Sequence, residues 1–238
     1  MKQQNSVSVV LPTYNESENI LEVLEKLSQA LGKQLCEIIV VDDNSPDETW
    51  KIVEDLKNPK YKVIRRTEER GLASAIRNGV CEAKGEIIIW MDADLGIPPE
   101  IAPQLVEALN MSDVAIGSRY VKGGADPRPF PLPFLSNCLN VYARLLFGSQ
   151  IRDYTSGVAA VRKNIVSQVL WSDAGFGEYF AEFSYRCIKR KVRIVELPLQ
   201  YKIRKSGVSK LSGGSIWVVL RYGVQYGVKM IKWRLRMK

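Results

Sequence analysis

The stretch Ile87-Ile88-Ile89-Trp90-Met91-Asp92-Ala93-Asp94 decides the fold. Its first five residues form a short apolar run, which predicts a strand buried on both faces of a parallel sheet. Two aspartates follow where the strand stops, and side chains two residues apart in extended backbone can converge on one hard cation. Open α/β sheets bind ligands at this end of their strands, so the stretch predicts a metal and a phosphate. A bare Asp-x-Asp also ends strands or caps helices, so the rest of the chain must decide.

Strand and helix patterns alternate along the first half of the chain. Apolar runs predict strands at 7–11, 37–41, 61–64, 86–91 and 114–117, and helical spacing predicts helices at 20–31, 49–56, 73–83 and 99–109. This alternation favours an α/β fold, a Rossmann-like and mostly parallel sheet flanked by helices. It also places residues 12–16, 42–47 and 92–94 along one edge of the sheet, where a ligand is expected.

Composition limits the chemistry. A chain of 238 residues that is 46% apolar and 25% charged suits one large globular domain. Its first six residues are polar and the next apolar run has only the length of a strand, so we expect no signal peptide and an active site facing the cytoplasm. Four scattered cysteines predict reduced thiols. The sequence has no histidine, which leaves carboxylates, Lys, Arg and a bound metal for catalysis.

Positive charge is concentrated at the C-terminal end. Residues 189–238 hold 14 basic side chains and one acidic side chain, Glu196, whereas residues 1–188 hold 20 basic and 25 acidic ones. A basic block of this kind binds nucleic acid, an anionic membrane face or a phosphorylated substrate.

The segment from Ile216 onward has the two-faced pattern of a helix. One stripe is polar and mostly basic, with Arg221, Gln225, Lys229, Lys232 and Arg236. The second stripe is Val219, Tyr222, Tyr226, Met230, Trp233 and Met237. Charges interrupt the run of about 18 apolar residues that a membrane span needs. The pattern favours an interfacial helix, with aromatic residues among lipid headgroups and cations toward anionic lipid. A helix packed on the domain or on a partner subunit is the alternative.

Residues 122–133, Lys-Gly-Gly-Ala-Asp-Pro-Arg-Pro-Phe-Pro-Leu-Pro, are expected to lack regular structure. Their length suits a mobile loop over the ligand crevice, and a surface loop without function is the alternative. The glycine-rich phosphate loops of dinucleotide dehydrogenases and P-loop kinases are missing from the sequence, which disfavours both classes.

Several short motifs occur in an order that points to one family. They are Val-Val-Leu-Pro-Thr-Tyr-Asn-Glu at 9–16, Val-Val-Asp-Asp-Asn-Ser-Pro-Asp at 40–47, Gly-Leu-Ala-Ser-Ala at 71–75, Met-Asp-Ala-Asp-Leu at 91–95, Gly-Ser-Arg-Tyr-Val-Lys-Gly-Gly at 117–124, Arg-Asp-Tyr-Thr-Ser-Gly at 152–157 and Arg-Lys-Ser-Gly-Val-Ser-Lys-Leu at 204–211. Together they resemble the GT-A, family 2 glycosyltransferases, and among these most closely the dolichol-phosphate mannosyltransferases. The resemblance implies a GT-A catalytic domain over residues 1–211 and leaves residues 212–238 as a basic amphipathic helix at a membrane interface.

The resemblance implies a role for each motif residue. The nucleoside of the sugar donor would be held by Pro12, Tyr14, Glu16 and Asp43, and the donor diphosphate with its Mg²⁺ or Mn²⁺ by Asp92, Ala93 and Asp94, with Arg204 and Lys210 on the phosphates. The acceptor phosphate would be held by Arg119, Ser136 and Arg128. The residues expected to act in catalysis are Asp92, Asp94, Arg119 and Arg204. The structural alternatives are a turn, a helix cap or a solvated charge.

Three positions depart from the family pattern. Gly96 stands where archaeal members often have a glutamine that joins the metal shell, so a water or a backbone oxygen must substitute. Glu48 stands where a glycine is usual, at the start of a predicted helix. Leu132 stands where related enzymes often carry an acceptor-binding arginine, and Arg128 is the candidate replacement.

The activity that the resemblance implies is an inverting transfer of mannose from GDP-mannose to polyprenyl (dolichyl) phosphate at the cytoplasmic face of a membrane. A phosphate monoester has a second pKa of about 6 and is largely anionic at neutral pH. Such an acceptor needs no general base, which agrees with a chain without histidine. The expected partners are a nucleotide sugar, a polyprenyl phosphate and the membrane surface, and a small membrane-anchoring subunit stays open.

Other functions also stay open from the sequence. A family 2 enzyme could act on a glycan or protein hydroxyl with Glu182 or Asp153 as the base, or could use another donor such as UDP-glucose. A sugar-nucleotide nucleotidyltransferase would carry a Gly- and Arg-rich loop after its first strand, where this chain has Pro-Thr-Tyr-Asn-Glu. A nucleic-acid-binding module built on the basic tail is disfavoured by the regular helical faces, and we expect no nucleic-acid partner.

Overall fold

The computed structural model describes residues 5–172, 175, 177–203 and 216–236, with the side chains of 216–220 left out. Within these ranges the strands form one seven-stranded sheet in the order β3-β2-β1-β4-β6-β5-β7. The strands are β1 (Val7–Thr13), β2 (Leu35–Asp42), β3 (Tyr61–Arg65), β4 (Ile87–Trp90), β5 (Val114–Ser118), β6 (Ala159–Arg162) and β7 (Ile194–Pro198). Neighbouring strands are parallel except where β6 pairs antiparallel with β4 and β5. The predicted mostly parallel sheet is confirmed.

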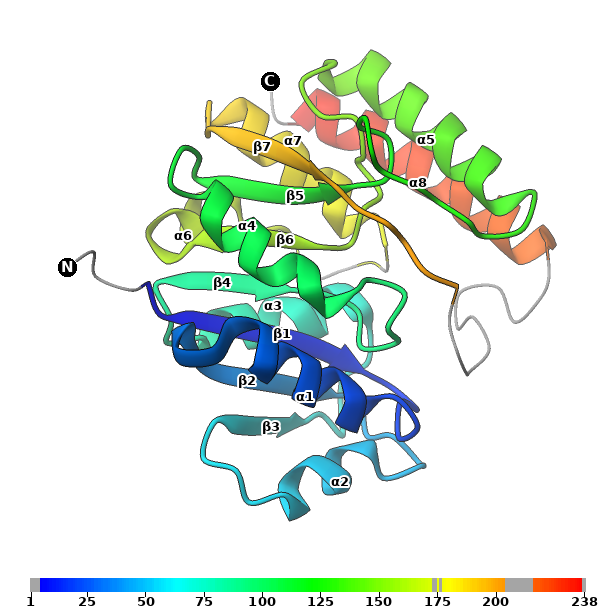
Figure 1. The fold of residues 1–238 in the computed structure, drawn as a ribbon. Coiled ribbons are helices and arrows are strands. Elements are labelled where there is room, and N and C mark those ends of the chain that lie inside the picture. The colour runs from blue at the N-terminus through cyan, green and yellow to red at the C-terminus, as the bar shows by residue number, and fades with distance from the viewer. Residues whose placement is uncertain (1–4, 173–174, 176, 204–215, 237–238) are drawn as a thin grey trace.

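Helices cover both faces of the sheet (Figure 1). They are α1 (Ile20–Leu31), α2 (Thr49–Asp55), α3 (Leu72–Glu82), α4 (Ala102–Ala108), α5 (Leu132–Phe147), α6 (Val166–Val169), α7 (Tyr179–Lys189) and α8 (Ile216–Arg236), with short 3-10 turns η1 (Gly32–Gln34), η2 (Pro99–Ile101) and η3 (Lys163–Ile165). One core cluster packs α1 and α4 on one face, and a second packs α3, α5, α7 and α8 on the other. The helix predicted over 99–109 is in fact η2 followed by α4.

The apolar run of β4 fills both core clusters. Ile87 and Ile89 belong to the cluster under α1 and α4, and Ile88 and Trp90 belong to the opposite one. Successive side chains of a strand point to opposite faces, so a strand covered on both sides must be apolar throughout. Because β1 lies between β2 and β4, the carboxyl ends of these three strands meet at one edge, as the sequence predicts.

The structure differs from the prediction at the C-terminal end of the segment 122–133, which is expected from the sequence to be irregular throughout. Helix α5 already begins at Leu132, so the last two positions of the predicted loop are helical. The reason is that Pro133 lies in the first turn, where the missing N–H has no helical partner to lose. Within the loop, Ala125 forms an isolated bridge with Gln200 after β7.

The C-terminal helix α8 is confirmed, and it packs along α5 and against α7 (Figure 1). Tyr226 and Met230 are buried and Trp233 packs on the same core cluster. The Tyr226 hydroxyl donates to the Tyr154 carbonyl at 3.0 Å, and Lys229 pairs with Glu178. The expectation that the aromatic stripe faces lipid is therefore wrong for Tyr226 and Met230, because these side chains complete the core.

Other parts of the C-terminal prediction are not reached by the structure. The predicted boundary between 211 and 212 and the residue Met237 lie outside the described residues, and the side chain of Val219 is not described either. Over the ranges that the structure covers, no helix combines the length and apolarity that a bilayer span requires.

Candidate active site

The Asp-x-Asp turn follows β4 at the carboxyl edge of the sheet. Asp92 is half-buried, Ala93 is buried, and Asp94 is 4% exposed with its Oδ1 accepting a hydrogen bond from the Gly96 N–H at 2.9 Å. No third Asp, Glu, Cys or His converges on a shared point with them within the described ranges. Mg²⁺ is usually held by one or two carboxylates together with substrate phosphates. Two hard oxygen ligands at a strand end therefore fit a divalent ion that shares its shell with a diphosphate.

The residues predicted to hold the nucleoside lie at the ends of β1 and β2. The Asp43 N–H donates to the Thr13 carbonyl at 3.1 Å, which joins the two loops. Glu16 is buried, and its carboxylate accepts the Asn19 side-chain amide at 2.8 Å. Tyr14 is half-buried, with an exposed arginine 5.4 Å from its ring centroid. The structure thus brings Tyr14, Glu16 and Asp43 together with Pro12, the last but one residue of β1.

Asp43 belongs to a buried ion pair that sequence reasoning missed. The Arg66 Nε donates to Asp43 Oδ1 at 2.7 Å, and the Gly71 N–H donates to Oδ2 at 2.8 Å. Arg66 also donates to the Gly71 carbonyl at 2.9 Å and to Ser74 Oγ at 2.8 Å. Arg66 fixes the carboxylate and ties it to the start of α3. Its place directly after β3, at the ligand edge, is the signal that could have identified it.

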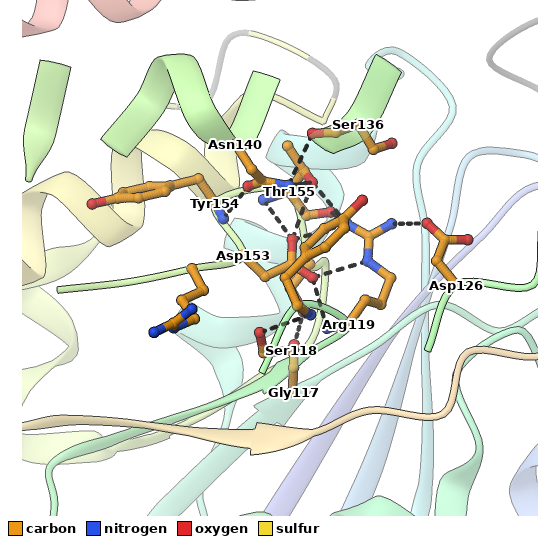
Figure 2. A network of polar contacts seen from close by, with 12 residues as sticks. Gly117, Ser118, Arg119, Asp126, Ser136, Asn140, Asp153, Tyr154 and Thr155 are labelled. Carbon is orange, nitrogen blue, oxygen red and sulfur yellow. Dashed lines mark hydrogen bonds and ion pairs between the residues drawn. The ribbon is translucent and has the colours of Figure 1, made fainter. Parts of the chain in front are cut away.

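A second buried network is centred on Arg119, which directly follows β5 (Figure 2). The Arg119 Nε and Nη2 each donate to one Asp153 oxygen at 2.9 Å, and Nη2 also donates to the Thr155 hydroxyl at 2.7 Å. Burial alone would raise the pKa of the Asp153 carboxyl, but the Arg119 charge and hydrogen bonds hold that pKa below its ordinary value of 3.8. Asn140 of α5 donates to the same Thr155 hydroxyl at 3.0 Å.

Asp126 joins Arg119 to Arg128 of the segment 122–133. The Arg119 Nη1 lies 3.4 Å from Asp126 Oδ2, and the Arg128 Nε and Nη2 donate to Asp126 at 2.7 and 2.5 Å. The Arg128 Nη2 also donates to Ser136 Oγ at 3.0 Å. The three predicted acceptor-phosphate residues Arg119, Arg128 and Ser136 thus lie in one cluster, with the Asp126 carboxylate between the two arginines. Figure 2 shows Asp126 beside Arg119.

A cavity of about 440 Å³ adjoins this cluster. Arg119, Arg128 and Ser136 line its polar part together with Glu178. Apolar side chains of α5 and α8 form much of the remaining wall, namely Leu132, Leu135, Leu139, Tyr222, Val224 and Tyr226. A pocket with cations at one part and an apolar wall elsewhere matches an amphiphile with an anionic head. Leu132, the departure from the family pattern, belongs to the apolar wall.

Other predicted site residues have different outcomes. Arg204 and Lys210 lie outside the described residues. The candidate bases for a hydroxyl acceptor are both engaged, because Asp153 is held by Arg119 and Glu182 accepts from Arg186 at 2.7 Å and from Ser172. Glu48 has a φ of 57°, in the left-handed region that favours glycine, the residue that the family resemblance leads us to expect at this position.

A mostly parallel sheet with paired carboxylates at its carboxyl edge, beside a pocket lined by two arginines, has the arrangement expected of an enzyme of the nucleotide-sugar-binding GT-A class. Residues 8–170 match the family model described as Glycosyl transferase family 2, and the chain belongs to this family.

Curated relatives extend the comparison. Dolichol-phosphate mannosyltransferase of Pyrococcus furiosus is 44% identical over 223 residues, which are 91% of this chain and 62% of that protein. The chain thus spans less than two thirds of that relative's length. Polyprenol monophosphomannose synthase of Mycolicibacterium smegmatis is 32% identical, with 93% of this chain and 86% of that protein covered. Dolichol-phosphate mannosyltransferase of Saccharomyces cerevisiae is 33% identical, with 90% and 83% covered.

Solved structures support the fold. Glucosyl-3-phosphoglycerate synthase of Mycobacterium tuberculosis in complex with UDP superimposes with a TM-score of 0.74 at 18% identity, over 97% of this chain and 80% of that one. The same enzyme has been solved with Mg²⁺ and UDP, with a TM-score of 0.72 at 18% identity over 97% of this chain and 79% of that one. At this identity the likeness establishes the GT-A fold, in agreement with the prediction.

Proposed function

We propose that this protein transfers mannose from GDP-mannose to a polyprenyl phosphate, with inversion at the anomeric carbon, at the cytoplasmic face of a membrane. The observation that carries the proposal is the cavity beside Arg119, Arg128 and Ser136, because its apolar wall and cationic part suit a lipid phosphate. The names of the relatives from three organisms support both the sugar and the lipid class.

On the donor side, Asp92 and Asp94 would hold Mg²⁺ or Mn²⁺ with the diphosphate. The ion, when bound, neutralises charge that develops on the departing diphosphate. Asp43, fixed by Arg66, and Glu16 would orient the nucleoside at the neighbouring strand ends. The predicted roles of Arg204 and Lys210 on the donor phosphates belong to this proposal as well.

On the acceptor side, we propose that the lipid phosphate takes the place of the Asp126 carboxylate between the two arginines. The Arg128 Nε and Nη2 donate to that carboxylate in the geometry in which they would grip a phosphate. Arg119 is held by Asp153, so its remaining Nη1 presents a fixed positive charge. The phosphate oxygen is already anionic and needs no base, in keeping with the engagement of both Asp153 and Glu182.

The exposed surface of α5 and α8 supports a peripheral membrane position. Each helix carries an exposed row at helical spacing, and neither row belongs to the core. The rows are Phe134, Cys138, Val141 and Leu145 on α5, and Val224, Val228, Ile231 and Leu235 on α8. Arg221, Lys232 and Arg236 are exposed beside the α8 row, as in an interfacial helix facing anionic lipid. The two helices lie along one another (Figure 1).

The proposal is tested by incubating the full chain with radiolabelled GDP-mannose, Mg²⁺ and a polyprenyl phosphate. We expect label in the butanol-extractable lipid and none without the phosphorylated lipid. Parallel reactions with UDP-glucose test the donor, and reactions with a glycan or peptide acceptor test the hydroxyl alternative. Label in the glycan or peptide, with none in the lipid, would contradict the proposal.

A further inference from the structure

Tyr201 lies between the Asp-x-Asp turn and the arginine cluster. The segment after β7 is held on both sides by backbone hydrogen bonds. The Tyr201 N–H donates to the Ala125 carbonyl at 3.1 Å, and the Lys202 N–H donates to the Gly96 carbonyl at 2.8 Å. The Tyr201 ring faces Arg128, whose guanidinium carbon is 5.4 Å from the ring centroid. Tyr201 therefore contacts elements of both halves of the site.

The hydroxyl end of Tyr201 lies at the Asp-x-Asp turn. A Cβ placed on Gly96 would be 2.7 Å from the Tyr201 hydroxyl oxygen and 2.9 Å from Asp94 Oδ1. Both oxygens thus border the same small volume, and the glycine is what lets the phenol approach this closely. The ring is half-buried and its backbone is fixed on both sides, so the hydroxyl has little freedom to move away.

We infer that Tyr201 is a positioning residue for the divalent ion. Its hydroxyl fills the volume that a side chain at position 96 would take and sets the direction of the Asp94 carboxylate. The inference rests on the proposed function, because it needs the ion and the donor diphosphate at Asp92 and Asp94. A neutral phenol beside a ligating carboxylate is a common way to orient such a ligand, and loss of an orienting partner typically weakens metal binding by about 10-fold to 100-fold.

The test is Mn²⁺ affinity in the presence of GDP, measured on the full chain by isothermal titration calorimetry and by the Mn²⁺ electron paramagnetic resonance signal. We expect Tyr201→Phe to weaken Mn²⁺ binding by about tenfold. Its unfolding temperature without the ion should stay that of the wild type. The matched control is Tyr61→Phe, which removes a half-buried phenol hydrogen-bonded to Ser28 at 2.9 Å on β3, at the far edge of the sheet from β7.

The outcomes separate the two ideas. Equal Mn²⁺ affinity in wild type and Tyr201→Phe would overturn the role of Tyr201 and leave the proposed function intact. A wild type that binds no Mn²⁺ with GDP would overturn both.

A double-mutant cycle with Gly96→Ala gives an independent check. The added methyl group would press on both the Tyr201 hydroxyl and Asp94. If the added methyl group disturbs Asp94 mainly by displacing the Tyr201 hydroxyl, Gly96→Ala should weaken Mn²⁺ binding much less in a Tyr201→Ala background than in the wild type. Additive losses would contradict the inference, since they would mean that the methyl group at position 96 acts on the ion site independently of Tyr201.

Discussion

The donor half and the acceptor half of the site are built in different ways. On the donor side, Glu16, Asp43 and Asp94 each stand in the loop that follows its own strand, and the order of the strands brings these loops together. On the acceptor side, Arg119 depends on Asp153, which lies 34 residues further along, and the cavity is closed by α8. Strand order brings the donor residues together, and among these three Asp43 also has a long-range ion pair, to Arg66. On the acceptor side, long-range side-chain pairing positions the central residue, Arg119, itself. Substitutions should therefore cost mainly activity on the donor side, and stability as well on the acceptor side.

Asp92→Ala is expected to have the largest effect on activity. Loss of an ion ligand removes charge stabilisation at the leaving diphosphate, so turnover with Mg²⁺ should fall by about 10³-fold or more. Because Asp92 is half-buried at a strand end, the unfolding temperature should change little. Asp113→Ala is the matched control, since it also removes an aspartate, one paired with the exposed Arg193. Near-normal turnover of Asp92→Ala would exclude the ion site.

In contrast to Asp92→Ala, Asp153→Asn should lower the stability of the fold strongly. It removes the closest counter-charge of the buried Arg119 and leaves only Asp126, at 3.4 Å, so the free energy of unfolding at pH 7 should fall by about 3 kcal/mol. The Asp153 pKa is lowered in the folded state, so its stabilisation is present above the ordinary value of 3.8 and is lost as pH falls below it. Urea unfolding from pH 7 to 3 should show the two proteins converging in acid. Equal stability at pH 7 would contradict the buried-pair account.

Substitutions in the exposed rows of α5 and α8 test the membrane position. Leu145 is 81% exposed and Val228 is 47% exposed, so Leu145→Glu with Val228→Glu should leave the fold intact. We expect flotation with anionic liposomes to weaken by about tenfold or more, because two apolar contacts become charges. Met111→Glu, at an 86% exposed position after α4, is the control. Deletion of α8 is a poor test, since Tyr226 and Met230 belong to the core.

Asp126→Asn should have the smallest effect on activity of these substitutions, and in the favourable direction. If the acceptor phosphate replaces the Asp126 carboxylate, loss of this competing charge should lower the KM for polyprenyl phosphate by about threefold. This change corresponds to a difference in binding free energy of less than about 1 kcal/mol. The KM for GDP-mannose should stay constant. A higher acceptor KM would show that Asp126 aids binding instead.

The same contrast explains what could be predicted from the sequence. Buried parallel strands are apolar on both faces, so β1, β2 and β4 could be recognised, and the residues after them could be placed at one edge. The start of α5 could not, because Pro131 and Pro133 hide a first helical turn. Arg119 could be identified from its motif, but its pairing with Asp153 depends on a tertiary contact that no local pattern reveals.

The C-terminal helix illustrates the limit of periodicity. The spacing of Tyr226, Met230 and Trp233 correctly predicts a helix with an apolar face. Periodicity does not tell whether such a face meets lipid or protein. Here it meets α5 and α7, and the exposed row of Val224, Val228 and Ile231 is a separate face.

The packing of α8 against the domain has a consequence for the release of the two products of the proposed reaction. Tyr226 joins α8 to Tyr154, and Lys229 joins it to Glu178. The helix and the sheet would therefore bind a bilayer as one rigid body. A mannosylated lipid formed in the cavity beside α5 and α8 would drift away laterally within the plane of the membrane. The nucleotide, released at the carboxyl ends of β1 and β2, would escape into the surrounding water. The two products would leave the enzyme by separate routes, so the lipid chain would not block the binding of the next donor.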